Sequence, residues 1–357
     1  MKIAIMLGTR PEIIKMSPII RECEQLQLEY FILHTGQHYS YSMDRVFFEQ
    51  LELPQPHYNL NVGSGSHAEQ TGRILMGTDQ VLLKEQPDVV LVEGDTNTVL
   101  GGALAAAKLH IKVGHVEAGL RSYDRLMPEE INRVLTDHCA DVLFAPTEQA
   151  QQILLKEGIP SEKIFVTGNT IVDVVHHASL SEKHTRVLED LGLEKREYFL
   201  ATLHRQENVD DSYRFHDILR GLDALNKKYD LPVIYPVHPR SQKKLEEFQL
   251  DAPGVTLVDP MDFLGFLELE QNARVVLTDS GGVQEETCVL GTPCVTLRAN
   301  TERQETLAVG SNLLAGTMPE SIVECTSVMC ANKKTWGNPF GDGTAGKQIV
   351  RILREMV

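Results

Sequence analysis

Short runs of apolar and β-branched residues alternate along the chain with longer amphipathic segments. Continuous apolar runs of this kind are typical of parallel strands buried on both faces, and the segments between them have the periodicity of covering helices. The pattern predicts a first series of strands at residues 3–7, 30–34, 89–92, 113–116, 141–144 and 164–166. A second series is predicted at residues 198–203, 233–237, 255–258, 274–277 and 294–297. The predicted helices include residues 68–84, 129–138, 148–157 and 213–229.

The two series predict an α/β fold with two Rossmann-like, doubly wound parallel-sheet domains. We place the boundary after the last strand of the first series, so that residues 1–168 form an N-terminal domain and residues 169–343 a C-terminal domain. The segment 344–357 is amphipathic, with Ile349, Ile352 and Leu353 on one stripe. We expect this helix to cross back and cap the N-terminal domain.

Length, charge and cysteine content exclude several classes of function. The 357 residues suffice for two cores at about 150 residues per domain. The net charge of -16 argues against nonspecific binding to nucleic acid or to an anionic membrane. No stretch approaches the ~20 apolar residues that a bilayer span needs. The 6 cysteines include no CxxC and no zinc-finger spacing, which predicts reduced thiols in a cytoplasmic protein without a structural metal.

Polar residues follow many of the predicted strands directly. Ligands of open parallel sheets bind outside the carboxyl ends of the strands, so these residues predict one cleft that both domains face. Each of them taken alone could be a loop residue that caps a helix. The segments concerned are 8–12, 93–95, 117–121, 204–205, 238–240 and 278–282.

Two of these segments have the residue types of an anion site. Gly281 and Gly282 precede a predicted helix at residues 284–290, so backbone N–H groups and the helix N-terminus could hold a phosphate. Ser280 as an ordinary N-cap is the alternative. Arg10 and Lys15 bracket the start of the first helix, where cations oppose the helix dipole and an anionic ligand would explain them better.

Two other residues have less specific signals. Arg303 is a further phosphate candidate, and its alternative is a surface arginine paired with Glu302 or Glu305. Glu286 could bind the vicinal hydroxyls of a ribose, or it could be a solvated helix residue.

A set of carboxylates and imidazoles could transfer protons at the predicted cleft. This set contains Asp95, Glu117 and Glu129, with His204 and His238 in the second half. Such groups suit proton transfer at a sugar carbon and at a leaving phosphate. They could also bind a metal, but no pair has close ligand spacing. Each histidine alone is more often a packed or capping residue.

Several segments together resemble the non-hydrolysing UDP-N-acetylglucosamine 2-epimerases. The matching blocks are Gly-Thr-Arg-Pro-Glu-Ile-Ile-Lys at 8–15, Gly-Asp-Thr at 94–96, His-Val-Glu-Ala-Gly-Leu-Arg at 115–121, Pro-Glu-Glu-Ile-Asn-Arg at 128–133, His-Arg-Gln-Glu-Asn at 204–208, His-Pro at 238–239, Asp-Ser-Gly-Gly-Val-Gln-Glu-Glu at 279–286 and Thr-Glu-Arg at 301–303. They occur in the order of that family. The resemblance implies a glycosyltransferase-B architecture and a homodimer, and it implies neither a metal nor a nicotinamide cofactor.

The resemblance also implies roles for individual residues. UDP would bind the C-terminal domain, with its phosphates on Ser280, Gly281 and Gly282 and its ribose on Glu286. The implied uracil pocket contains Met261 and Phe266, and the implied diphosphate cations are Arg10, Lys15 and Arg303. The implied acid/base set is Asp95, Glu117, Glu129 and His204, with Arg133 beside it. An activating second UDP-N-acetylglucosamine, known for the bacterial members, would contact Gln37, His38, Arg73, Arg205 and His238.

The implied reaction converts UDP-N-acetylglucosamine to UDP-N-acetylmannosamine through elimination of UDP and its re-addition to 2-acetamidoglucal. Two segments differ from the family: residue 304 is Gln where proline is common, and segment 37–43 is longer than in the common bacterial form. Four alternatives stay open. They are a hydrolysing epimerase, an epimerase of a modified UDP-sugar, a glycosyltransferase of the same architecture and a nucleotide-sugar sensor without catalysis.

Overall fold

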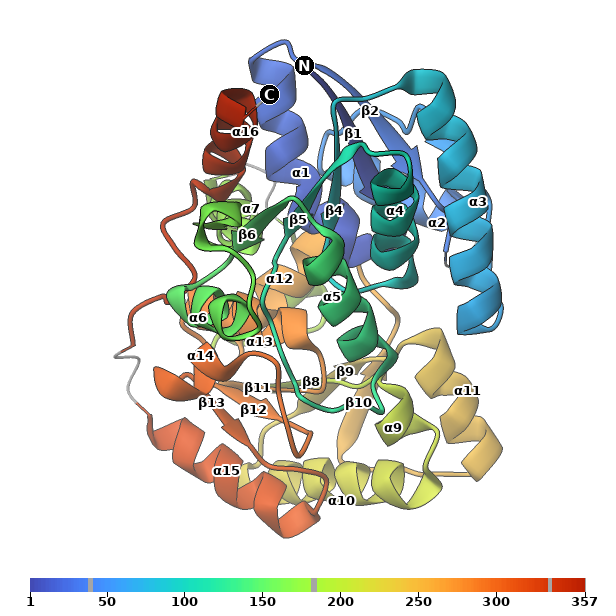
Figure 1. Ribbon diagram of the computed structural model, residues 1–357. Coiled ribbons are helices and arrows are strands. Elements are labelled where there is room, and N and C mark those ends of the chain that lie inside the picture. The colour runs from blue at the N-terminus through green and yellow to red at the C-terminus, as the bar shows by residue number, and fades with distance from the viewer. Residues whose placement is uncertain (38–40, 181–184, 333–335, 357) are drawn as a thin grey trace. The chain divides into compact units, whose positions relative to one another are not determined.

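The structure is a computed structural model that describes residues 1–37, 41–180, 185–332 and 336–356; for residues 41–44 and 180 it describes the backbone. The described chain divides into two compact units. The first contains Met1–His177 and Phe340–Val357, and the second contains Ala178–Pro339. Each unit has its own parallel sheet with helices on both faces, as Figure 1 shows.

The first unit has a 7-stranded sheet in the order β3-β2-β1-β4-β5-β6-β7. Its strands are β1 (Lys2–Leu7), β2 (Glu29–His34), β3 (Tyr58–Asn59), β4 (Val89–Glu93), β5 (Lys112–Val116), β6 (Val142–Ala145) and β7 (Ile164–Val166). Its helices are α1 (Arg10–Gln25), α2 (Tyr41–Gln50), α3 (His67–Glu85), α4 (Asn97–Lys108), α5 (Pro128–Cys139), α6 (Glu148–Lys156), α7 (Thr170–Leu180) and α16 (Ala345–Met356). The central strands β1 and β4 are almost wholly buried, because helices cover both of their faces.

The second unit has a 6-stranded sheet in the order β10-β9-β8-β11-β12-β13. Its strands are β8 (Phe199–Thr202), β9 (Val233–Pro236), β10 (Val255–Val258), β11 (Val275–Thr278), β12 (Cys294–Thr296) and β13 (Asn312–Leu314). Its helices are α8 (Val187–Asp190), α9 (Gln206–Val209), α10 (Ser212–Tyr229), α11 (Pro239–Phe248), α12 (Phe263–Asn272), α13 (Gly281–Leu290), α14 (Gln304–Ala308) and α15 (Pro319–Ala331). Large apolar clusters lie on both sides of this sheet.

The predicted α/β class with two Rossmann-like sheets is confirmed. The hydrophobic pattern does not predict two edge strands. The strand β3 has 2 residues, and β13 has 3 residues that begin with the buried Asn312. Neither gives the apolar run that a central strand gives, because an edge strand is short and only partly covered.

The chain returns to the first unit at its end. The Asp173 carboxylate on α7 accepts hydrogen bonds from the backbone N–H groups of Ala345 (3.1 Å) and Gly346 (2.9 Å), which begin α16. Ile349 and Leu353 on α16 are fully buried. Because α7 holds the start of α16 in this way, the first unit runs on to His177, whereas the sequence places the domain boundary at 168.

Both sheets reverse their strand order at the first strand of the unit. In the first unit β1 lies between β2 and β4, and in the second β8 lies between β9 and β11. The loops that follow two strands at such a reversal run in opposite directions and leave a crevice at the carboxyl ends. This topology makes the segments after β1, β4, β8 and β11 the natural places for a ligand.

Candidate active site

Glu12 joins the loops that follow β1 and β4. Its carboxylate accepts hydrogen bonds from the backbone N–H groups of Gly8 and Thr9 (2.9 Å to Thr9), and from the Thr96 hydroxyl. Thr9 is the N-cap of α1, so Glu12 completes a capping box. Burial raises the pKa of Glu12 to about 7, although these hydrogen bonds lower it; the charge of Asp95 adds to the rise. Glu12 can therefore hold a proton near neutral pH.

Lys15 lies one turn further along α1, between two buried carboxylates. Its ammonium forms an ion pair with Glu117 and lies 3.7 Å from an oxygen of Glu93. The Asn169 amide donates a further hydrogen bond of 3.0 Å to Glu117. The charge of Lys15 is thus met within the protein, so a bound anion is not needed to explain this cation near a helix start.

Glu93 is the last residue of β4 and is 2% exposed. Burial raises its pKa well above the ordinary range; Lys15 opposes this rise, and the nearby charges of Glu117, Glu12 and Asp95 reinforce it. Carboxyl groups therefore crowd the ends of β4 and β5, and burial keeps protons among them. A site with this property can supply and accept a proton at low cost.

Glu117 has a left-handed backbone, with φ at 68°. A non-glycine residue in this region costs of order 1–3 kcal/mol and persists only where its surroundings fix it. Here the backbone N–H of Ala118 donates to the Phe144 carbonyl (3.1 Å), and that of Gly119 donates to the Asp137 carboxylate (3.2 Å). The turn fixes the position from which the Glu117 side chain reaches Lys15.

Asp95 follows β4 and forms an ion pair with Arg133 on α5. Arg133 also contacts the Glu130 carboxylate at 2.8 Å, and Glu130 accepts hydrogen bonds from the backbone N–H groups of Ser122 and Tyr123, both 2.9 Å. Arg133 therefore lies beside Asp95, one of the residues of the acid/base set that the resemblance implies. It also ties the loop after β4 to the loop before α5.

Two other predicted residues of the first unit lie at helix starts. Glu129 is in the first turn of α5, after Pro128. Arg10 begins α1, and its guanidinium lies over the Phe47 ring, 5.2 Å from the ring centroid. Both side chains are half-buried, so neither is closed off from a ligand.

Asp279 holds the loop that follows β8 in the second unit. This carboxylate is fully buried and accepts from the backbone N–H groups of His204 (3.2 Å) and Arg205 (3.1 Å) and from the Asn208 amide (3.1 Å). Burial would raise the pKa of Asp279, but the His204 imidazole 3.2 Å away and these hydrogen bonds bring it below the ordinary value. The His204 and His238 rings lie 6.4 Å apart between centroids.

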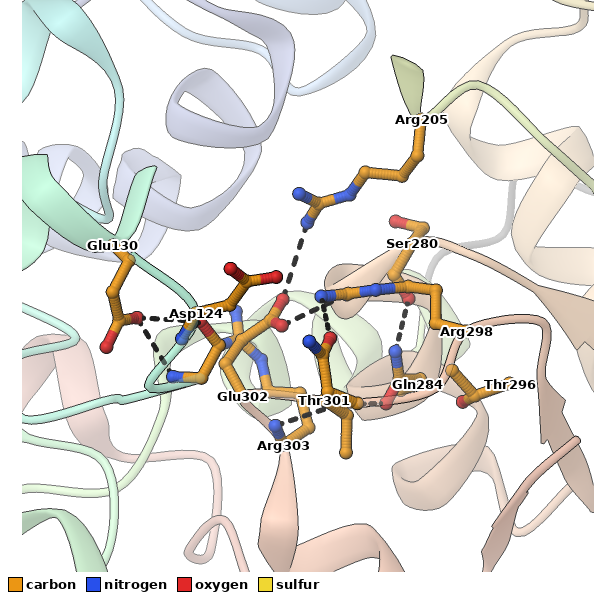
Figure 2. A network of polar contacts seen from close by, with 12 residues as sticks. Asp124, Glu130, Arg205, Ser280, Gln284, Thr296, Arg298, Thr301, Glu302 and Arg303 are labelled. Atoms are coloured by element: carbon orange, nitrogen blue, oxygen red, sulfur yellow. Dashed lines mark hydrogen bonds and ion pairs between the residues drawn. The ribbon is translucent and has the colours of Figure 1, made fainter. Parts of the chain in front are cut away.

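Helix α13 begins at the glycine pair. Ser280 is its N-cap residue but makes no capping hydrogen bond with its side chain, so the ordinary N-cap interpretation does not hold. Instead, the Gln284 side-chain amide donates to the Ser280 backbone carbonyl (3.1 Å), and its Oε1 accepts from the Thr301 hydroxyl (2.7 Å). Figure 2 shows these bonds. A Cβ on Gly281 would overlap the Glu302 carboxylate, which explains the glycine.

Arginine and glutamate side chains surround this helix start. Arg298 contacts Glu302 at 3.0 Å, and Arg205 contacts Glu302 at 3.4 Å, as Figure 2 shows. Arg303 is buried and forms an ion pair of 2.7 Å with the fully buried Glu285 on α13. The alternative of Arg303 as a surface residue is therefore wrong. The structure brings Arg205 and Arg303 to one end of α13, where their positive charge can add to that of the helix dipole.

The predicted uracil and ribose residues lie on α12, α13 and the segment before α12. Met261 and Phe266 pack as partly buried side chains against the apolar cluster of α12 and the sheet. Glu286 is half-buried, and one of its carboxylate oxygens lies 3.9 Å from the place of a Cβ on Gly282. The Glu286 carboxylate therefore folds back toward the first turn of α13.

The predicted activator residues of the first unit are tied into other contacts. Gln37 is buried, and its amide oxygen accepts from the backbone N–H (3.0 Å) and hydroxyl (2.8 Å) of Thr98. Arg73 is half exposed and contacts Glu69 at 2.6 Å. His38 lies outside the described residues. Arg205 and His238 belong to the second unit.

Sequence reasoning missed several residues that complete these networks. Arg298 follows β12, so the rule that points to strand ends could have found it. Glu93 lies in the predicted segment 93–95, but the sequence assigns it no role. In the sequence, Glu302 is only a possible partner of Arg303, and Asn169 lies at the predicted domain boundary without any signal of a site residue. No group of His, Cys, Asp and Glu side chains among the described residues is arranged to hold a metal ion. In the described chain, no helix is both long and apolar enough to span a membrane.

Comparison with known proteins identifies the family. A family model described as UDP-N-acetylglucosamine 2-epimerase matches residues 21–354. The chain is 54% identical to the UDP-N-acetylglucosamine 2-epimerase of Methanococcus maripaludis, over 99% of this chain and 98% of that protein. The chain belongs to the UDP-N-acetylglucosamine 2-epimerase family. The resemblance to UDP-N-acetylglucosamine 2-epimerases that the sequence motifs predict is thereby confirmed at the level of this family.

Two further relatives support the assignment to this family. The structure of the UDP-GlcNAc 2-epimerase of Methanocaldococcus jannaschii in complex with UDP-GlcNAc and UDP is 54% identical, with a TM-score of 0.95 over 99% of this chain and 100% of that chain. The UDP-2,3-diacetamido-2,3-dideoxy-D-glucuronate 2-epimerase of Pseudomonas aeruginosa is 41% identical over 100% of both chains. The glycosyltransferase-B type of architecture, with two Rossmann-like domains, is shared with the epimerases of solved structure.

Proposed function

We propose that this protein catalyses the reversible C2 epimerisation of UDP-N-acetylglucosamine to UDP-N-acetylmannosamine without net hydrolysis. The observation that carries the proposal is the group of buried carboxyls at the ends of β4 and β5. Burial raises the pKa of both Glu12 and Glu93 there, beside Asp95 and Glu117. An enzyme that removes a proton from one face of a sugar carbon and returns one to the other needs such a store of protons.

The proposed reaction has two halves that balance. In the first half the bond from C1 to the diphosphate oxygen breaks, UDP leaves with the electron pair, and a carboxylate takes the C2 proton. The product is 2-acetamidoglucal. In the second half UDP adds back to C1 while a carboxyl group delivers a proton to the opposite face of C2. Asp95, Glu117 and Glu129 are the candidates for these transfers, and His204 is a fourth.

The second unit is proposed to hold the nucleotide. Gly281 and Gly282 offer backbone N–H groups at a helix start, and Ser280, whose own backbone N–H donates to the Thr278 hydroxyl, offers its side-chain hydroxyl; phosphate binding at such a place is common. Arg303 and Arg10 supply positive charge for the departing diphosphate, with Lys15 acting through its contact with Glu117. A cation of this kind stabilises developing charge by several kcal/mol. Met261 and Phe266 would contact the uracil, and Glu286 the ribose.

A deuterium experiment tests the mechanism. The protein is incubated with UDP-N-acetylglucosamine in deuterated water and the products are followed by proton NMR. We expect a deuteron at C2 of UDP-N-acetylmannosamine and of the recovered substrate. A product without deuterium at C2 would refute the elimination. Accumulation of free N-acetylmannosamine with UDP would instead identify a hydrolysing epimerase.

A second candidate substrate is a UDP-sugar modified at C3 and C6. The 41% identity to the Pseudomonas aeruginosa enzyme, whose name specifies a 2,3-diacetamido uronate, favours testing it. The same NMR assay with UDP-2,3-diacetamido-2,3-dideoxyglucuronate decides between the two by their relative kcat/KM. The homodimer, the cytoplasmic location and activation through Gln37, His38, Arg73, Arg205 and His238 stay predictions.

A further inference from the structure

Glu270 is a fully buried acid that the proposed mechanism does not use. It lies near the end of α12, and its exposed fraction is 0%. Neither of its carboxyl oxygens accepts a hydrogen bond from any donor among the described residues. An ionised carboxylate in such a place would be very costly, because burial removes its water and nothing replaces it. Glu270 is therefore held as the neutral carboxylic acid.

The described groups that shift the pKa of Glu270 include an acid and no cation. Burial raises its pKa well above the ordinary range, and the neighbouring Glu286 on α13 raises it further. The Cys294 thiol on β12 is near enough to feel the charge of Glu270. The Tyr198 hydroxyl, also nearby, donates to the Leu269 carbonyl at 2.6 Å.

The remaining acids on neighbouring elements point elsewhere. Glu268 on α12 accepts a hydrogen bond from the Thr185 hydroxyl. Glu189 and Asp190 on α8, which packs against α12, are exposed to solvent. Glu286 is therefore the acid to which Glu270 can donate a hydrogen bond. A protonated carboxyl is a donor, and a half-buried carboxylate beside it is an acceptor.

Glu286 has a second neighbour on its own helix. One of its oxygens lies 3.9 Å from the place of a Cβ on Gly282, in the first turn of α13. The side chain thus has the buried acid at one side and the glycine turn at the other. A bond from Glu270 would fix which way the Glu286 carboxylate faces.

We propose that Glu270 is a positioning residue: as a carboxylic acid it donates its proton to the Glu286 carboxylate and holds that carboxylate toward the ribose hydroxyls of bound UDP. The inference rests on the proposed function, in which Glu286 binds the ribose. Hydrogen bonds to a charged acceptor are about twice as strong as neutral ones, so the arrangement favours binding of a vicinal diol over its deoxy analogue.

The test compares UDP with 2′,3′-dideoxy-UDP by isothermal titration calorimetry. Glu270→Leu removes the donor, and we expect it to weaken UDP binding roughly 10-fold at neutral pH, with less than about a twofold change for dideoxy-UDP. Glu270→Gln keeps a donor that cannot ionise. Wild-type binding of UDP should weaken as pH rises above neutral and Glu270 loses its proton, while Glu270→Gln should lack this part of the alkaline loss.

Glu268→Gln is the matched control, an acid-to-amide change on the same helix that should leave both affinities unchanged. A Glu270→Leu variant that loses UDP and dideoxy-UDP equally would show a purely structural role and overturn the proposal. A Glu270→Gln variant that keeps the wild-type pH profile would also overturn the proposal. This measurement decides about the proposal if the Glu270→Leu variant does not fold. Wild-type protein that binds both nucleotides equally would refute the ribose role of Glu286 and this inference with it. The deuterium assay would still report the proposed reaction separately.

Discussion

Replacement of Glu12 by glutamine should change how the stability of the first unit depends on pH. Glu12 is 1% exposed, and burial raises its pKa from 4.5 to about 7. Between these two values the folded protein binds a proton that the unfolded chain has lost, so stability falls as pH rises through this range. At 1.36 kcal/mol per pKa unit, the loss from Glu12 amounts to about 3 kcal/mol and is complete above about pH 7.

Hydrogen exchange is the suitable assay. The single tryptophan, Trp336, lies in the second unit, so tryptophan fluorescence does not report on β1. Exchange of the β1 and β4 amides, followed by mass spectrometry between pH 4.5 and 7.5, gives their free energy of opening. Glutamine is neutral throughout and has nearly the same shape. The difference between wild type and Glu12→Gln should therefore change by about 3 kcal/mol across this range, with the variant relatively more stable at the upper end.

Groups that do not interact with Glu12 titrate over the same range and cancel in the difference. Glu148→Gln, an exposed acid at the start of α6, is the matched control and should parallel the wild type. Parallel curves for wild type and Glu12→Gln would refute the raised pKa. The proton that we assign to this corner of the site would then have to be held elsewhere.

Three further predictions follow from the same structure. Asp95→Asn and Glu117→Gln should each lower kcat by roughly 10²–10⁴-fold, because each removes a proton-transfer group. The Kd of UDP, measured by calorimetry, should stay within about threefold of the wild-type value. An unchanged kcat would remove the residue from the acid/base set. Lys15→Met leaves Glu117 and Glu93 buried without their cation. Chemical denaturation at pH 7 should therefore show a loss of stability of about 3–5 kcal/mol. The loss should be smaller at pH 5, because Glu93 and its neighbours hold more protons there. Leu353→Ala should lower the stability of the first unit by about 2–5 kcal/mol and leave exchange in β8 unaffected; equal losses in both units would show that α16 does not belong to the first.

Most of the core strands could be predicted because their signal is local. A strand such as β4 is covered on both faces, so its residues form an unbroken apolar run. The edge strands β3 and β13 lack that run. The place of a motif is also local information: the glycine pair at 281–282 and the Gly-Asp-Thr at 94–96 directly follow apolar runs, so the sequence suffices to assign both to strand ends.

Contacts between distant residues could not be predicted in the same way. Lys15 meets Glu117 across 102 positions, because β1 and β5 both adjoin β4 in the sheet and no sequence pattern encodes that order. The sequence pattern accordingly predicts Lys15 to be a ligand cation. The burial of an acid cannot be predicted from the sequence either. In the sequence, Glu270 is one of several charged residues of a helix, and only the packing of α12 removes its side chain from water.

The sequence alone therefore determined the class of fold, the two sheets and the segments that carry chemistry, because apolar runs and motif spacing are properties of neighbouring residues. The tertiary structure decided the pairing and protonation of the buried acids. Both depend on how much water is excluded and on which charge lies within a few ångströms. Those quantities arise from strand order and helix packing, which bring Glu12, Glu93, Asp95 and Glu117 together from separate parts of the chain.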